Sequence, residues 1–357
     1  MVEWKKLGEA CEIIRGKRVT KGDLIDNGKF PVISGGVTPM GYIDSYNREP
    51  NTITVSQYGT AGYVDFQQSR FWANDICYCV YPEKPLDNKY LWYVLKSKQD
   101  LLYAIRNTDA IPYSLPVDSL KSVSIPIPPL SEQTRIVGIL DTFTSAIDNL
   151  KEQIAQRRKQ YEYYRDQLLD LEGKEGVERV LLKDVCEVIN GRAYSQPELL
   201  NEGKYRVLRV GNFFSNDSWY YSDLELESKY YCQKGDLLYA WSASFGPHIW
   251  EEEKVIYHYH IWKMDCSNGL HKKFMYYWLQ SEDMKRQAFT NLHGATMAHL
   301  TKALMESLQV PVPPIQEQQR IVSILDTFEA SIQNLEAQLK EREKQYEYYR
   351  NKLLTFE

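Results

Sequence analysis

The phrase KQYEYYRDQLLDLE, at residues 159–172, returns at residues 344–357 as KQYEYYRNKLLTFE. The similarity begins further upstream, because IPIPPLSEQTRIVGILDTF (125–143) corresponds to VPVPPIQEQQRIVSILDTF (310–328). An internal repeat takes priority over other signals when an architecture is assigned. The sequence therefore predicts two related units, each of which closes with the same kind of long segment.

Both repeated segments have the apolar spacing of a long helix. Apolar residues recur by fours and threes at Ile136, Leu140, Phe143, Ile147, Leu150, Ile154, Tyr161, Tyr164 and Leu168, and again at Ile321, Leu325, Phe328, Ile332, Leu335, Leu339, Tyr346, Tyr349 and Leu353. Arg157 and Arg342 interrupt this heptad pattern once in each copy. A helix of about 40 residues is about 60 Å long and must bury its apolar stripe. We expect the two helices to pack against each other in antiparallel fashion; a coiled coil between two chains is the alternative.

The two halves also open alike, with LGEACEIIRGKR (7–18) and LKDVCEVINGRA (182–193), but they match only weakly in between. The intervening residues mix the patterns of strands and helices. Apolar runs and amphipathic patterns predict strands at 30–36, 52–66, 75–82, 206–212, 236–251 and 254–264, and helices at 88–105 and 271–289.

These patterns predict an α+β fold with a pseudo-two-fold internal repeat. Two α/β domains would be separated by two long helices that form an antiparallel coiled-coil spacer. We expect the first globular domain at 1–127, the first helical spacer at 128–172, the second globular domain at 173–312 and the second helical spacer at 313–357.

The composition limits the class of protein. The chain has 357 residues, of which 43% are hydrophobic, and no apolar run is long enough for a membrane span or a signal peptide. We therefore expect a cytoplasmic protein, with free thiols rather than disulfides. The formal net charge is -5, whereas a protein that holds duplex DNA alone is usually basic. This charge still permits a DNA-binding chain that shares its phosphate contacts with partner subunits.

The chemistry-bearing motifs of enzymes are missing from the sequence. It contains no GxxxxGK[ST] loop, no GxGxxG and no HExxH. Cys77 and Cys79 lack a second pair of ligands. His258 and His260 alternate on an expected strand, so one of them would face the core and the other solvent. We therefore expect neither a catalytic site nor a metal site.

Two loops in each globule have the composition of a binding surface. SQYGTAG (56–62) in the first half corresponds to AWSASFG (240–246) in the second, and NTDAIPY (107–113) corresponds to LHGATMA (292–298). Small residues allow close backbone approach, and Gln, Ser and Thr can contact phosphates or base edges. For each of these residues, a tight hairpin turn with satisfied polar groups is the alternative interpretation.

With the repeated P[IV]PPxxEQxRIVxILDTF phrase and the opening EWKKLGEACEIIRGKR, the chain resembles the specificity subunits of type I restriction–modification systems. The resemblance implies that each globule is a target recognition domain for one half of a split, asymmetric site in double-stranded DNA. The helices would set the gap and dock two adenine-methyltransferase subunits, and motor-nuclease subunits would join for cleavage. S-adenosylmethionine, ATP and Mg²⁺ would belong to those partners, so the chain itself would be non-catalytic and need no cofactor.

This interpretation selects two groups of candidate residues. The DNA-binding candidates are Arg18, Gln57, Tyr58, Gly59, Thr60, Asn107, Tyr113, Arg192, Ser242, Ser244, Phe245, His293, Thr296 and His299. The partner-binding candidates are expected to be surface positions shared by both helices, and a solvated helix face is the alternative explanation of their charges. They are Gln133, Arg135, Asp141, Lys159 and Arg165, with Gln318, Arg320, Asp326, Lys344 and Arg350. A non-catalytic scaffold with two protein-binding domains on a coiled-coil strut remains the alternative, and a single-chain enzyme would need motifs that are not found.

Overall fold

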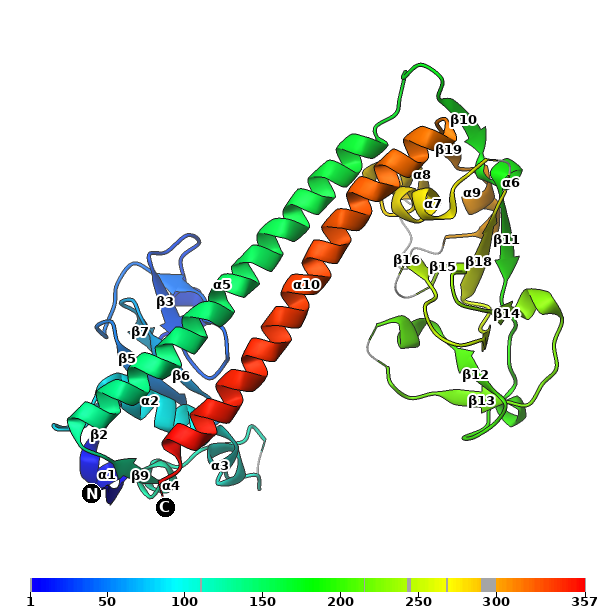
Figure 1. Ribbon diagram of the computed structural model, residues 1–357. Helices are drawn as coiled ribbons and strands as arrows, with labels where there is room; N and C mark the ends of the chain where they lie inside the picture. Colours follow the sequence, from blue (N-terminus) through cyan, green and yellow to red (C-terminus); the bar gives the residue numbers. More distant parts are fainter. Residues whose placement is uncertain are drawn as a thin grey trace. The chain divides into compact units, whose positions relative to one another are not determined.

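The computed structural model describes residues 2–109, 111–214, 216–242, 245–267, 269–289 and 300–356. The chain divides into two compact units. Unit 1 consists of Met1–Lys151 with Ala337–Glu357, and unit 2 consists of Glu152–Glu336. Each unit therefore combines one globular domain with one part of each long helix (Figure 1).

Unit 1 is built from small sheets and short helices. In chain order its globular part contains β1 (Glu3–Lys6), α1 (Leu7–Ala10), β2 (Cys11–Arg15), β3 (Phe30–Ile33), β4 (Tyr42–Ile43), β5 (Thr52–Ser56), β6 (Val64–Gln67), β7 (Trp72–Ala73), β8 (Cys77–Pro82), α2 (Asn88–Ser97), α3 (Gln99–Ala104), α4 (Val117–Lys121) and β9 (Ser124–Ile127). Its described strands form sheets in the orders β2-β8-β5-β6, β4-β3-β7 and β1-β9. The core forms where α2 packs on β5 and β8, so Tyr90, Leu91 and Val94 are buried.

Unit 2 repeats this topology, except that its second sheet has an additional strand at one edge. Its globular part contains β10 (Glu178–Leu181), α6 (Leu182–Val185), β11 (Cys186–Asn190), β12 (Tyr205–Leu208), β13 (Tyr220–Ser222), β14 (Tyr231–Cys232), β15 (Leu237–Ala240), β16 (Gly246–Ile249), β17 (Val255–Tyr257), β18 (Ile261–Cys266), α7 (Lys272–Trp278), α8 (Glu282–Phe289), α9 (Lys302–Ser307) and β19 (Gln309–Val312). The described strands form sheets in the orders β11-β18-β15-β16, β13-β12-β17-β14 and β10-β19. The repeat therefore extends to globules whose sequences match only weakly.

The two long helices are α5 (Leu130–Leu169) and α10 (Ile315–Leu354). Most of the buried side chains on them belong to the expected heptad seam, among them Ile136, Leu140, Ile147, Ile154, Tyr161, Ile321 and Leu325. No helix in the described ranges combines the length and the apolar character that a membrane crossing requires.

The helices run antiparallel in each unit, as the sequence predicts. In unit 1 the rings of Phe143 and Tyr349 stack at 5.3 Å. In unit 2 the repeat-equivalent rings of Phe328 and Tyr164 stack at 5.4 Å. The same aromatic layer therefore forms twice, once in each unit.

The interruptions of the heptad pattern complete these layers. The guanidinium of Arg342 lies 5.8 Å from the ring centroid of Phe143 in unit 1. The guanidinium of Arg157 lies 5.9 Å from the ring centroid of Phe328 in unit 2. Stacking over the ring gives each cation a favourable place beside the seam.

Several expected elements are divided in the structure. The helix predicted at 88–105 breaks at Lys98 into α2 and α3, and the helix predicted at 271–289 breaks after Trp278 into α7 and α8. The strand predicted at 254–264 is also wrong, because residues 258–260 form the connection between β17 and β18. His258 and His260 therefore do not alternate on a strand.

Candidate nucleic-acid interface

A glycine follows β2 in unit 1 and β11 in unit 2, and it brings basic residues to one end of the four-stranded sheet that contains this strand. A Cβ on Gly16 would meet the Ala73 carbonyl oxygen at 2.1 Å, and one on Gly191 would meet the His258 carbonyl oxygen at 2.3 Å. Without these side chains, the backbone of Lys17 can donate to Ala73 O at 2.9 Å. The shared phrase in the two openings thus encodes a close backbone crossing.

In unit 1 this crossing leads directly to the first candidate, Arg18. Arg18 and the preceding Lys17 are both exposed. They follow β2 at the end of the sheet where Arg15 of β2 pairs with Tyr78, and Ser56 of β5 pairs with Cys77. Residues 57–60 begin at the same end of the sheet, so the structure brings these sequence candidates together.

The loop at residues 57–60 is tied down by its backbone. Gln57 is buried; its N–H donates to Ile76 O, and its carbonyl accepts from Leu115 N, both at 2.8 Å. Gly59 has a φ of +74°, which favours glycine. Thr60 is half-buried, whereas Tyr58 is exposed. Tyr58 and Gly59 therefore present the accessible surface of this loop.

The second candidate loop of unit 1 is a hairpin beside the first. Asn107 N donates to Ser114 O at 2.7 Å, and Ser114 N donates to Asn107 O at 3.1 Å. Ser114 also pairs with Tyr58 of the neighbouring loop. The Asn107 side chain accepts from Asp109 N at 2.8 Å, and Asn107 and Tyr113 are both exposed. Four of the unit 1 candidates (Arg18, Tyr58, Asn107 and Tyr113) therefore expose their side chains at one edge.

In unit 2 the crossing glycine places Arg192 at the equivalent edge. Arg192 N donates to Tyr257 O at 3.1 Å, and the guanidinium pairs with Glu198 at 2.6 Å. This partner, with Ser195 as a further hydrogen-bond donor, lowers the pKa of Glu198 to about 2. The Arg192 Nη1 is buried without a hydrogen-bond partner among the described residues. Arg192 is thus held in place rather than free to extend.

The loop after β15 supplies the remaining described candidates of unit 2. Ser242 is half-buried, and Phe245 packs against the main core of the unit. Phe245 is therefore positioned at least partly for packing. Ser244, His293, Thr296 and His299 lie outside the described residues.

Next to this loop, the turn between β17 and β18 gathers rings that the sequence did not single out for DNA binding. Trp241 Nε1 donates to Tyr259 O at 2.8 Å, and the imidazoles of His258 and His260 lie 4.9 Å apart. Burial, together with nearby His260 and Arg209, lowers the pKa of His258 to about 4. His258 is therefore neutral at pH 7 and can take part in hydrogen bonds without adding charge. Within the described segments, no three His, Cys, Asp or Glu side chains gather to hold a metal ion.

The helix candidates divide sharply by burial. Gln133 and Gln318 are fully buried, so the expectation that they lie on the surface is wrong. Gln133 accepts from Asp87 N at 2.7 Å and donates to Pro128 O at 2.9 Å. Gln318 accepts from His271 N at 2.7 Å. Each glutamine fastens the start of a long helix to its own globule, which leaves no room for a partner contact.

Asp141 and Asp326 also bind their own globules. Asp141 pairs with Lys89 at 2.7 Å and accepts from the Tyr93 hydroxyl at 2.6 Å. Asp326 makes the equivalent ion pair with a lysine and accepts from the equivalent tyrosine hydroxyl on α7. Burial, followed by the hydrogen bond to the carboxylate, raises the pKa of both tyrosines. These aspartates join α2 and α7 to the long helices.

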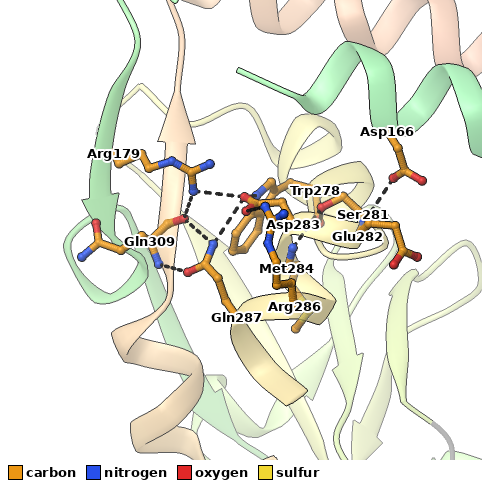
Figure 2. A network of polar contacts seen from close by, with 10 residues as sticks. All are labelled: Asp166, Arg179, Trp278, Ser281, Glu282, Asp283, Met284, Arg286, Gln287 and Gln309. Carbon is orange, nitrogen blue, oxygen red and sulfur yellow. Dashed lines mark hydrogen bonds and ion pairs between the residues drawn. The ribbon is translucent and has the colours of Figure 1, made fainter. Parts of the chain in front are cut away.

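Arg165 is likewise not the exposed residue that the sequence suggests. It is buried and pairs with Asp166 at 3.0 Å. Asp166 in turn accepts from Glu282 N at 3.2 Å, at the start of α8 (Figure 2). The same network includes an ion pair between Arg179 and Asp283 at 3.0 Å. Arg165 thus borders the attachment of α5 to the globule of unit 2.

The remaining helix candidates face solvent to different degrees. Arg135 and Arg320 are exposed, and each pairs with the glutamate three residues earlier. Lys159 and Lys344 are also exposed, whereas Arg350 is half-buried beside Tyr346. Arg135 and Arg320 are the exposed candidates that occupy equivalent positions near the start of each helix.

Comparison with known proteins agrees with this duplicated arrangement. The family model for the type I restriction modification DNA specificity domain matches residues 1–157 and 174–343. The chain belongs to this family.

Two relatives resemble this chain over nearly its whole length. It is 28% identical over 379 residues to a putative type I restriction enzyme specificity subunit of Haemophilus influenzae, with 99% of the chain and 96% of the relative covered. It is 27% identical over 394 residues to a type I restriction enzyme specificity subunit of Escherichia coli, with 99% and 94% covered.

Solved structures share the fold of the specificity-family chain. The S subunit of a type I restriction-modification system from M. genitalium superposes with a TM-score of 0.68 at 20% identity, covering 100% of this chain and 97% of that one. A chain from a structural study of complex assembly and conformational transition in the type I R-M system gives a TM-score of 0.60 at 17% identity, with 99% and 97% covered. Both comparisons concern the arrangement of the backbone.

Proposed function

We propose that this chain is the non-catalytic DNA-reading subunit of a type I restriction–modification complex, in which each unit reads one half of a bipartite, asymmetric target. The observation that carries the proposal is that the same end of the sheet, where the crossing glycine and a candidate loop lie, occurs in both units. Both units use a crossing glycine to bring a basic residue beside a candidate loop, yet the side chains at this place differ. Equivalent placement with different chemistry is what reading two different half-sites requires.

The partners in this proposal are double-stranded DNA, two adenine-methyltransferase subunits and the motor-nuclease subunits. The net charge of -5 suits a chain that encloses DNA only together with other subunits. Catalysis, with S-adenosylmethionine, ATP and Mg²⁺, would belong to those subunits. The two long helices would fix the gap between the half-sites and present two equivalent docking surfaces.

Independent reading predicts that substitutions in one unit damage one half-site. Replacing Arg18 and Tyr58 by alanine in unit 1 should weaken discrimination at one half-site by about 10- to 100-fold, since a lost base contact costs about 1–3 kcal/mol. Ser242→Ala in unit 2 should affect the other half-site alone. The measurement is methylation by the complete complex of a duplex library randomised in both half-sites.

A change of preference in both half-sites after the unit 1 substitutions would contradict independent reading. Thr38→Ala, a polar position of unit 1 outside the candidate set, serves as a control. The scaffold alternative predicts a different result in a measurement of DNA binding. A pair of protein-binding domains would show no salt-dependent DNA binding in any complex.

Docking is expected to depend on Arg135 and Arg320. Reversing both charges, Arg135→Glu with Arg320→Glu, should reduce the number of methyltransferase subunits retained by the chain in a native mass measurement. The change should leave the fold intact, because exposed ion pairs such as those to Glu132 and Glu317 contribute little stability.

A matched variant separates partner docking from the local ion pair. Adding Glu132→Arg and Glu317→Arg to the charge reversal restores an ion pair of opposite direction on each helix. If assembly also recovers in this quadruple variant, the local pair rather than a partner contact accounts for the loss. Unchanged stoichiometry in the original double variant would remove these arginines from the docking surface.

A further inference from the structure

The hairpin of unit 1 holds an apolar side chain out in solvent. Ile111, near its tip, is 90% exposed, the highest value among the large hydrophobic side chains that the structure describes. Single exposed apolar groups are ordinary on protein surfaces. Ile111 differs because it lies at the edge of unit 1 that carries the DNA-binding candidates, where Tyr58 and Tyr113 are also exposed.

The stem of this hairpin is fixed. Besides the paired backbones of Asn107 and Ser114, the next residue, Leu115, is completely buried in the core. Leu115 O also accepts a hydrogen bond from the Tyr78 hydroxyl at 3.2 Å. The stem is therefore anchored on the sheet. Because the hairpin is already ordered, little conformational entropy would be lost when Ile111 contacts a binding partner.

Cations accompany the apolar tip. The Arg106 guanidinium lies 4.8 Å from the ring centroid of Tyr103 and 5.4 Å from that of Tyr113, and its Nε donates to Tyr103 O at 2.7 Å. Lys17 and Arg18 are exposed at the same edge. The cores of protein–protein interfaces are depleted in charge, whereas an apolar side chain on a surface that also carries arginine and lysine is the composition used on bent DNA. The surroundings therefore favour nucleic acid as the occupant.

We propose that Ile111 is an intercalating wedge, whose side chain inserts between two base pairs of the half-site read by unit 1 and kinks the duplex there. The inference rests on the proposed function and adds to it a second mode of reading. Pyrimidine–purine steps unstack most easily. Insertion at such a step would contribute sequence preference without a hydrogen bond to any base.

The test uses the full chain with its methyltransferase subunits and a duplex that carries the mapped target. A fluorescent adenine analogue, 2-aminopurine, replaces one base at a time in the half-site of unit 1, excluding the methylated adenine. Binding of the unsubstituted complex should raise the fluorescence at one step, because the analogue brightens when it is unstacked. Ile111→Ser should abolish this rise and weaken binding by about tenfold or more. Ile111→Leu, which keeps the apolar bulk, should retain the rise.

Ile25→Ser is the matched control, because Ile25 is exposed at 44% but belongs to another part of unit 1. It should leave the fluorescence unchanged. If half-site-specific methylation proceeds with no fluorescence rise at any step, the wedge fails and the proposed function stands. If the unsubstituted complex methylates without sequence preference, both fail. If Ile111→Ser loses methyltransferase subunits in the absence of DNA, Ile111 contacts protein and the wedge is wrong.

Discussion

Removing one heptad from each long helix should shorten the preferred gap between the half-sites by about three base pairs. The deletion takes residues 153–159 from α5 and 338–344 from α10, which shortens each helix by about 10 Å. B-DNA rises about 3.4 Å per base pair. If the helices set the gap, a change of this size must appear in the target. This is the largest change of specificity that we expect from any variant considered.

The deletion preserves the two aromatic pairs between the helices, although it removes one seam residue from each helix, Ile154 and Leu339, and the stacked Arg157 and Arg342. The stacked pair of Phe143 and Tyr349 in unit 1 lies outside the deleted residues, as does the pair of Tyr164 and Phe328 in unit 2. A loss of seven residues also keeps the heptad phase. The ion pairs of Lys151 with Glu343 and of Arg158 with Glu336 are lost, but both are exposed and contribute little.

The measurement is methylation of duplexes that differ only in gap length. Three base pairs also rotate one half-site by nearly a third of a turn, since a turn takes about 10–10.5 base pairs. Affinity should therefore fall even at the shortened gap. Deleting four residues per helix, 153–156 and 338–341, should be worse because it puts the seam out of phase. Full activity of the heptad deletion at the original gap would show that the helices do not measure distance.

The long helices could be predicted from sequence because their pattern is periodic and occurs twice. A heptad seam of nine positions specifies helix, length and buried face together. Because the helix occurs twice, the second copy can serve as the packing partner of the first. Phe143 and Phe328 are then expected to have equivalent surroundings. Even the interruptions by Arg157 and Arg342 fit the structure, although their stacking on the phenylalanines requires a three-dimensional view.

The candidate docking residues were harder to predict, for a physical reason. A heptad pattern identifies the face that packs on the other helix and assigns the remaining positions to solvent. Each helix, however, also packs on its own globule. Gln133 and Asp141 are polar but face α2 or the loop before it, where they satisfy backbone and hydroxyl groups. The duplication of these residues in the second helix thus reflects a duplicated attachment as well as any duplicated docking surface.

The DNA-edge candidates show the limits of loop composition. The sequence placed Gln57 and Tyr58 in one loop, but only the structure separates the buried amide from the exposed ring. The connection at residues 258–260 contains neither glycine nor proline, so nothing in YHYHIW signals a turn. Ile111 was part of the second loop, yet its exposure depends on the hairpin stem and could not be predicted from residue type.

The buried glutamines identify the other variants with large expected effects. Gln318 joins three backbone groups at the start of α10: it accepts from His271 N at 2.7 Å and donates to Pro313 O at 2.8 Å and Gly269 O at 2.9 Å. Gln133 does the same for unit 1, where its amide also donates to Pro85 O at 3.3 Å. Glutamine suits this position because one side chain supplies both an acceptor and two donors.

Gln318→Leu should destabilise unit 2 by at least about 2 kcal/mol, because the leucine fills the space but leaves buried backbone groups without partners. The melting temperature of unit 2 should fall by about 4–8 °C. The neighbouring Gln319 is exposed, so Gln319→Leu is the matched control and should change stability by less than about 0.5 kcal/mol. Hydrogen exchange gives the local measurement, since the amide of His271 should exchange faster in Gln318→Leu while that of Asp87 in unit 1 does not. If both leucine variants melt together and the His271 amide stays protected, this glutamine does not hold the helix to its globule.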